Sequence, residues 1–173
     1  MENKNSGKNI IVNYGLILGG IAILISLVQY SLGEHLTPNP IYGVISFGLM
    51  IAAIVLGIKK LKELNQGYIS FGEAVKVGVG IAVVSALISI IYNLIFIYFI
   101  EPDFLDQMLQ KQEEDMFNKG MKEEQIKAAM AMANKLKGPF ISSAVGIVAS
   151  AFMGFIVSAI TGAIVKKSKE EIS

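Results

Sequence analysis

The chain has 173 residues, of which 53% are apolar and 17% charged, and its net charge is +1. A soluble domain usually carries about 25% charged residues. Here four stretches of at least 24 residues contain none, namely 9–33, 35–58, 77–100 and 138–165. Since a helix needs about 20 apolar residues to cross a bilayer, an ordinary soluble fold is excluded.

The chain also lacks the residue types that most catalytic and cofactor sites need. It contains no cysteine, one histidine (His35), and lysine at every basic position. The absence of cysteine excludes thiolate metal sites, and the absence of arginine disfavours nucleotides and nucleic acids as partners. His35 stands near acids (Glu34, Glu101, Asp103, Asp106), but one histidine is weak support for a divalent metal site. We therefore expect no enzyme activity, cofactor, metal or known small-molecule ligand.

The first two predicted spans, about 10–32 and 41–58, form a helical hairpin. Pro38 and Pro40 end the first helix and suit the start of the second. The basic start of the chain also resembles a cleaved signal peptide. However, the apolar run Ile10–Leu32 is 23 residues long, against about 7–15 in a signal peptide. We favour a retained span, with a cleaved signal as the alternative.

A capping motif precedes the third predicted span, about 77–100. In the run Ser70-Phe71-Gly72-Glu73, the serine and the glutamate have the spacing of a capping box. The third helix is therefore predicted to begin at Phe71, before the charge-free stretch. Within the span, Asn93 is the strongest candidate for a polar contact inside the membrane. We interpret Asn93 as a residue that forms a hydrogen bond between helices. The alternative is that it lines a substrate path.

Residues 101–138 read as two amphipathic helices outside the membrane. The first carries an apolar stripe, a helix stop follows at Asn118-Lys119-Gly120, and a second stripe follows. These stripes pack on each other or on the bilayer surface, or they bind a partner, since methionine-rich faces adapt to many shapes. The candidate partner-binding residues are Phe104, Met108, Met116, Phe117 and Met130.

The fourth predicted span, about 140–165, carries a ridge of small residues spaced four apart. A ridge of this kind lets another helix backbone approach closely. Two interpretations are open: the ridge packs within the bundle, or it contacts a second protein or a second copy. The ridge residues are Ser142, Gly146, Ser150, Gly154, Ser158 and Gly162.

Lysine distribution predicts the orientation. Nine lysines, including Lys4 and Lys169, lie in the two tails and the 59–76 loop, whereas the six lysines of 101–137 are diluted among eight acids. The positive-inside rule then places both termini in the cytoplasm. Lys135 and Lys137 lie close to the fourth span on the outer side, which conflicts mildly with this assignment.

The chain resembles the DUF4199 family of small four-span membrane proteins of Bacteroidota. The resemblance rests on the run from Gly67 to Gly78 (GYISFGEAVKVG), on Glu101-Pro102-Asp103-Phe104-Leu105 after the third span, and on the small-residue fourth span. It implies an inner-membrane location, which makes residues 101–138 periplasmic. The family has no established activity, so the resemblance implies no catalytic residues.

The sequence as a whole predicts an all-α protein. Residues 1–173 form a single membrane domain, a four-helix transmembrane bundle with an amphipathic extracytoplasmic hairpin between spans three and four. The leading function is a non-enzymatic accessory, assembly or scaffold subunit that contacts the bilayer and other membrane proteins or itself. The alternative is an oligomeric small transporter or channel for a neutral solute, because the spans contain no charged side chain. A polar cavity around Asn93 would favour that alternative.

Overall fold

The computed structural model describes residues 2–37 and 39–167, and within them every regular element is helical. Pro38 and Lys169, which entered the turn and orientation predictions, lie outside the described residues. Four long segments are apolar enough to cross a membrane. The all-helical class is thereby confirmed, and the four apolar helices support a multi-pass membrane protein. The elements are α1 (Glu2–Ser31), α2 (Pro40–Leu64), α3 (Phe71–Ile95), the π-helical turn η1 (Phe96–Ile100), α4 (Phe104–Asn118), α5 (Glu123–Leu136) and α6 (Pro139–Val165).

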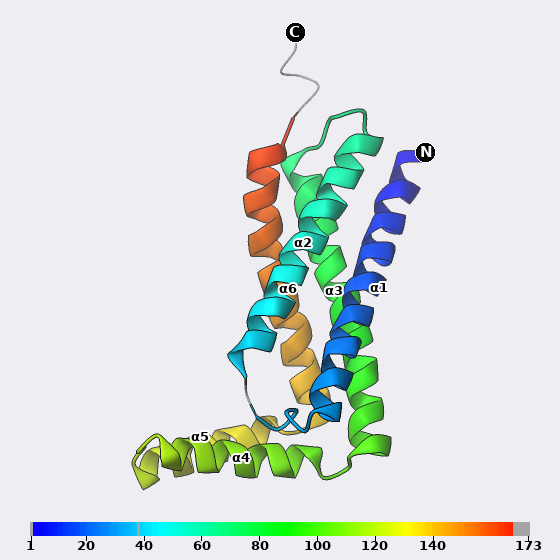
Figure 1. Ribbon diagram of the computed structural model, residues 1–173. Helices are drawn as coiled ribbons and strands as arrows, with labels where there is room; N and C mark the ends of the chain where they lie inside the picture. The colour runs from blue at the N-terminus through cyan, green and yellow to red at the C-terminus, as the bar shows by residue number, and fades with distance from the viewer. Residues whose placement is uncertain (1, 38, 168–173) are drawn as a thin grey trace.

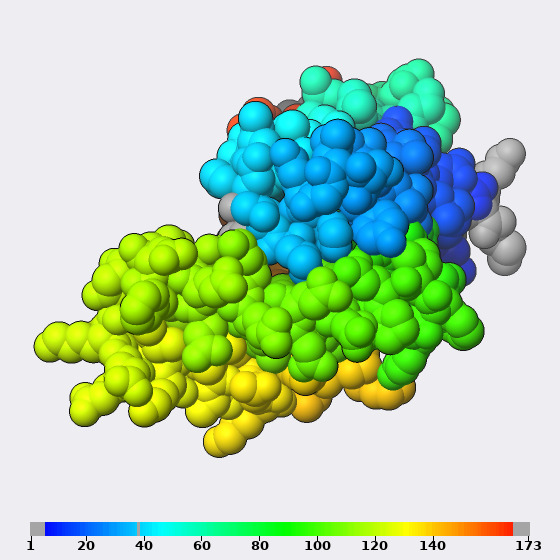
Figure 2. Space-filling view, turned by 60° about the horizontal axis from the view of Figure 1, so that its bottom comes forward, coloured from blue at the N-terminus to red at the C-terminus, as the bar shows by residue number. Residues whose placement is uncertain are grey.

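The four long helices form an upright bundle, and the two short ones lie across one end of it (Figure 1). The beginning of α1 and the end of α6 lie at the opposite end. That end also contains the α2–α3 connection, and the 59–76 segment around it carries Lys59, Lys60, Lys62 and Lys76. We therefore call it the lysine-rich end. Figure 2 shows that α4 and α5 extend sideways beyond the bundle. We call these two helices the α4–α5 hairpin.

Helices α3 and α6 approach each other closely in the half of the bundle near the lysine-rich end. A Cβ atom added to Gly78 would lie 2.3 Å from the Cβ of Ser158, and one added to Gly154 would lie 2.6 Å from the Cβ of Ala82. Only residues with little or no side chain permit this spacing. The apolar core lies in the same half. Its buried residues are Ile10, Leu18, Ile54, Ile58, Leu61, Ile69, Ala74, Val77, Ile81 and Val157.

Hydrogen bonds close the lysine-rich end. The hydroxyl of Ser70 accepts from the backbone N–H of Glu73, whose carboxylate accepts from the N–H of Ser70, so α3 begins at Phe71 as the capping motif predicts. Two backbone hydrogen bonds join Ile69 to Lys167 in an isolated bridge. The Lys62 ammonium donates to the carbonyl of Val165 at 2.8 Å, which satisfies a carbonyl at the end of α6.

The other half of the bundle is open. Helix α3 has no buried residue between Ser85 and η1, where Phe96 is buried again. The first two turns of α2 are largely exposed, including Val44 at 72% and Ile45 at 45%. The bundle is thus packed at the lysine-rich end and splayed near the α4–α5 hairpin.

Candidate functional site

A cavity of about 440 Å³ lies between α1, α2, α3 and α6 in the open half of the bundle. We call it the inner cavity. Half of its fourteen lining residues are polar, and none is charged. The polar ones are Ser46, Ser85, Ser89, Asn93, Ser142, Ser143 and Ser150, and the others are Leu18, Ala22, Met50, Ala82, Ala86, Ile90 and Gly146.

The inner cavity divides the ridge of small residues on α6. Gly154, Ser158 and Gly162 are buried against α3, whereas Ser142, Gly146 and Ser150 line the cavity. A Cβ atom added to Gly146 would meet nothing within 4 Å. The ridge therefore serves packing in one half of the helix and leaves space in the other.

The chemistry of the inner cavity suits a neutral polar molecule. Serine hydroxyls and the Asn93 amide both donate and accept hydrogen bonds, and they carry no charge that must be compensated in a membrane. Asn93 is exposed and lines this space. Histidine, lysine and acidic side chains are absent from the lining, so it offers no general base or charged relay.

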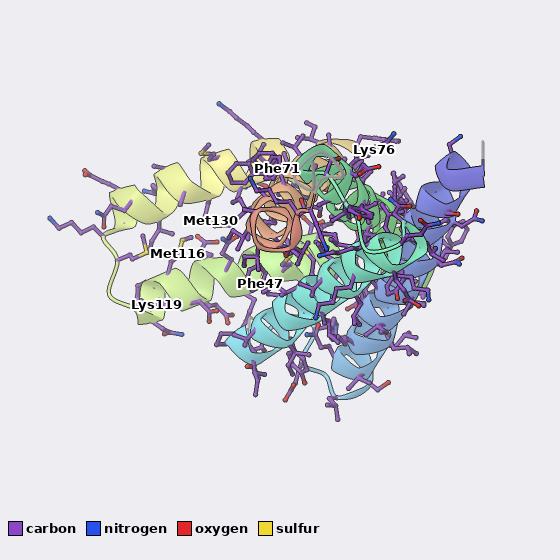
Figure 3. All side chains as sticks on the ribbon, turned by 90° about the horizontal axis from the view of Figure 1, so that it is seen from above. Phe47, Phe71, Lys76, Met116, Lys119 and Met130 are labelled. Carbon is purple, nitrogen blue, oxygen red and sulfur yellow. The ribbon has the colours of Figure 1, made fainter. Side chains whose placement is uncertain are left out.

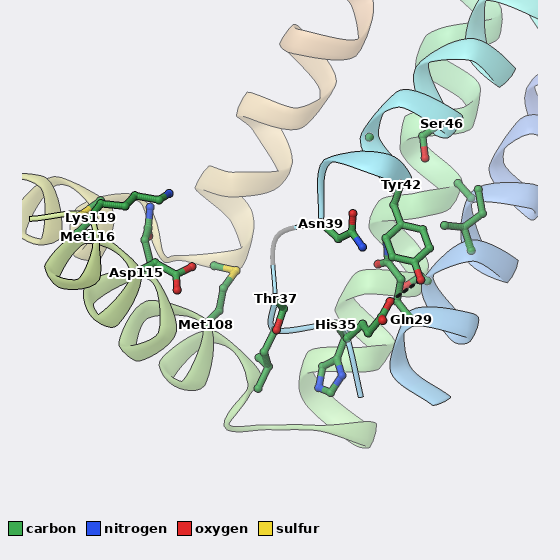
Figure 4. A pocket seen from close by; sticks show the side chains of 17 residues that line it. Gln29, His35, Thr37, Asn39, Tyr42, Ser46, Met108, Asp115, Met116 and Lys119 are labelled. Atoms are coloured by element: carbon green, nitrogen blue, oxygen red, sulfur yellow. Dashed lines mark hydrogen bonds between the residues drawn. The ribbon is translucent and has the colours of Figure 1, made fainter. Parts of the chain in front are cut away.

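A second, larger cavity of about 680 Å³ lies between the α1–α2 connection and α4 (Figure 4). We call it the outer cavity. Five titratable groups line it: Glu34 and His35 from the connection, Tyr42 from α2, and Asp115 and Lys119 from α4. The Tyr42 hydroxyl at its edge donates to the Glu34 carboxylate at 2.5 Å. Ala22 and Ser46 line both cavities, so the two spaces meet between α1 and α2.

An aromatic cluster attaches α4 to the bundle beside the outer cavity. The His35 ring stacks on Phe104 with centroids 6.1 Å apart and meets the edge of Tyr30 at 5.0 Å, while Phe96 packs edge-on against Phe104. His35 Nε2 lies 3.0 Å from a carboxylate oxygen of Glu101, although the ring is not aligned for a hydrogen bond. In the described part of the chain, no group of three histidine or acidic residues is placed to hold a metal ion.

Comparison with known proteins identifies the family. The family profile described as "Protein of unknown function (DUF4199)" matches residues 13–167. The chain belongs to the DUF4199 family. No curated protein and no solved structure matches it.

In this DUF4199 protein the five residues of the predicted partner-binding face do not share one surface. Phe104 packs in the aromatic cluster, and Met108 lines the outer cavity. Met116 and Met130 lie between α4 and α5, where Met116 also borders the outer cavity (Figure 3). Phe117 is 74% exposed and borders a groove on the other side of the hairpin. The stripe on α4 is therefore divided between the bundle and the solvent side.

Two features of this DUF4199 protein were not predicted from the sequence. The outer cavity depends on Gln29, Tyr42 and Asp115, which are separated by up to 86 positions in the chain. No local motif links them; only the packing of α4 across the bundle brings them together. The other feature is η1, the π-helical turn that ends the third span and brings Glu101 to His35.

Proposed function

We propose that this protein is a non-enzymatic, multi-pass protein of the inner membrane that binds a molecule with neutral hydrogen-bonding groups in the inner cavity. The observation that carries this proposal is the uncharged polar lining around Asn93 in an otherwise apolar bundle. Polar side chains that water does not reach inside a membrane need hydrogen-bond partners, and a lipid tail offers none. A molecule with hydroxyl, amide or ester groups satisfies them.

The proposed orientation places the lysine-rich end in the cytoplasm and the α4–α5 hairpin in the periplasm. Lysines flank the spans mainly at the packed end, as the positive-inside rule requires of a cytoplasmic face. The inner-membrane location rests on the occurrence of DUF4199 proteins in Bacteroidota that the sequence resemblance implies. In this orientation the cavities open toward the periplasmic half of the bilayer and are closed toward the cytoplasm.

The proposed hairpin is amphipathic and lies along the outer surface of the bilayer. Leu109 of α4 and Ile126 of α5 are its buried residues, whereas Glu113 and Glu114 are exposed. The hairpin crosses the end of the bundle instead of continuing the direction of the spans (Figure 1). An apolar face can then rest on lipid while the acidic groups stay in water.

If the molecule bound in the inner cavity is a neutral solute, the protein would act as a transporter of that solute. Four spans are few for a transporter that acts alone, so we expect movement across the membrane to require an oligomer. The packed lysine-rich end would then open while the α4–α5 end closes.

A second candidate is the accessory, assembly or scaffold subunit that the sequence predicts. It is favoured by the sideways projection of the hairpin (Figure 2). A groove on this projection is lined by Phe117, Ile126, Gln110 and four charged residues, Glu113, Glu114, Glu123 and Lys127. An exposed aromatic side chain with a charged rim is typical of a protein contact.

Mass spectrometry of molecules retained by the purified protein tests the binding proposal. Gly146→Phe fills the inner cavity from α6, and Val148→Phe adds the same ring two residues away at a position that is 69% exposed. We expect the wild-type protein and Val148→Phe to retain the same small molecule in mild detergent, and Gly146→Phe to lose it. Equal retention by both variants, or no retained molecule in the wild type, refutes the proposal. A stoichiometric copurifying protein would instead favour the scaffold function.

A further inference from the structure

We infer that the two cavities together bind one phospholipid with an amine-bearing, zwitterionic headgroup, whose head lies in the outer cavity and whose ester region lies in the inner cavity. This inference rests on the proposed function, because it identifies the molecule with neutral polar groups as the ester region of a lipid.

The adjacency of the two cavities is the first step. Ala22 on α1 and Ser46 on α2 line both spaces, with no large side chain from either position between them. The outer cavity lies where α1 ends and α2 begins, at the level of the α4–α5 hairpin. The inner cavity lies deeper among the spans. This order from charged to neutral polar surface matches the order of chemical groups in a phospholipid.

The charges of the outer cavity are the second step. Asp115 and Lys119 face it from α4, and no hydrogen bond or ion pair engages either side chain within the described part of the chain. Glu34 lines it from the α1–α2 connection. A headgroup with an ammonium and a phosphate complements both signs: the carboxylates accept from the ammonium, and Lys119 donates to the phosphate. A primary ammonium donates hydrogen bonds, whereas the quaternary ammonium of choline has no N–H to donate.

The path for the acyl chains is the third step. Residues 43–48 at the start of α2 are exposed, and α2 crosses α6 in the view of Figure 1, so that its beginning lies to one side of α6. The side chains there that face outward are apolar, including Val44 and Phe47. Acyl chains can therefore leave the inner cavity into the bilayer without crossing a polar surface.

Native mass spectrometry tests this inference. The protein is reconstituted in nanodiscs that contain equal amounts of phosphatidylethanolamine, phosphatidylcholine and phosphatidylglycerol, and the retained lipid is identified after release. We expect the wild type to retain phosphatidylethanolamine about tenfold over the other two, the effect of one charge-assisted hydrogen bond. Asp115→Asn should reduce this preference to about twofold or less, whereas Lys119→Gln, whose contact is with the phosphate that all three lipids share, should lower the retention of all three. The controls Glu124→Gln and Lys135→Gln, which change exposed residues outside the cavities, should leave both the preference and the retention unchanged.

The outcomes separate this inference from the proposed function. If Gly146→Phe abolishes lipid retention but Asp115→Asn leaves the preference unchanged and Lys119→Gln leaves the total retention unchanged, the headgroup assignment is wrong and binding in the inner cavity stands. The same conclusion follows if the wild type retains the three lipids equally. If Gly146→Phe retains as much lipid as the wild type, both the assignment and the proposed function fail.

Discussion

The ridge on α6 offers a matched pair of substitutions, because two of its glycines face opposite environments. Gly154 is packed against α3, whereas Gly146 faces the inner cavity. Both lie inside the same helix, so replacing either glycine by alanine should increase the intrinsic stability of the helix by the same amount. Replacing a mid-helix glycine by alanine stabilises a helix by about 0.5–1 kcal/mol. Any difference between the two variants therefore reports the surroundings of the new methyl group.

At Gly154 the methyl carbon would lie 2.6 Å from the Ala82 Cβ and 3.3 Å from the Gly78 carbonyl oxygen. Carbon atoms pack at about 3.5–4.0 Å, so α3 and α6 must separate by about 1 Å. Neither alanine side chain can rotate away. Overpacking of this kind costs about 1–3 kcal/mol, so Gly154→Ala should lower the free energy of unfolding by about 1–2 kcal/mol after the helix gain. Gly146→Ala meets nothing within 4 Å and should raise it by up to about 1 kcal/mol.

Unfolding of the purified protein in mixed micelles with sodium dodecyl sulfate, followed by circular dichroism, measures both values. The expected result is a lower midpoint for Gly154→Ala and an equal or higher one for Gly146→Ala. Equal shifts in the same direction would refute the division of α6 into a packed half and an open half.

Three further predictions address the capping box, the inner cavity and the orientation. Ser70→Ala removes the cap of α3 and should lower the free energy of unfolding by about 1 kcal/mol in the same titration. In protein stripped of bound lipid, Ser89→Cys should react with a water-soluble thiol reagent because it lines the polar inner cavity, whereas Leu87→Cys, exposed on the other side of α3, should face the surrounding apolar phase and resist it. Since the chain has no native cysteine, a membrane-impermeant reagent should label Asn118→Cys in intact spheroplasts and Lys60→Cys only after lysis.

The helix starts and stops could be predicted because their causes are local. The capping box at Ser70 and Glu73 begins α3 at Phe71 whatever surrounds it. Similarly, Gly120 adopts φ +73° just after α4 ends at Asn118, a conformation that glycine adopts without steric cost. The long charge-free stretches likewise identify the four spans by composition alone.

The site could be predicted only in part because it depends on relations between helices. The sequence indicates Asn93 as the strongest candidate for a polar contact in its span, and the structure places it in the lining of the inner cavity. The outer cavity and the cluster around His35 depend on where α4 lies, which η1 helps to determine. The five bulky apolar residues of η1 carry no local signal for a π-helical turn.

The position of the inner cavity nevertheless has a cause in the sequence, and the cause is on α3. Along α3 the residues opposite the ridge recur every four positions. Close contacts link Gly162 to Ala74, Ser158 to Gly78, and Gly154 to Ala82. Continued at the same spacing, this register places Ala86 opposite Ser150 and Ile90 opposite Gly146, and all four of these residues line the inner cavity. The partner positions thus change from small to branched at Ile90. A branched side chain keeps the two backbones apart where the ridge alone would allow contact. A small-residue repeat therefore produces a close helix contact only as far as the facing helix repeats it, and it leaves a cavity beyond that point.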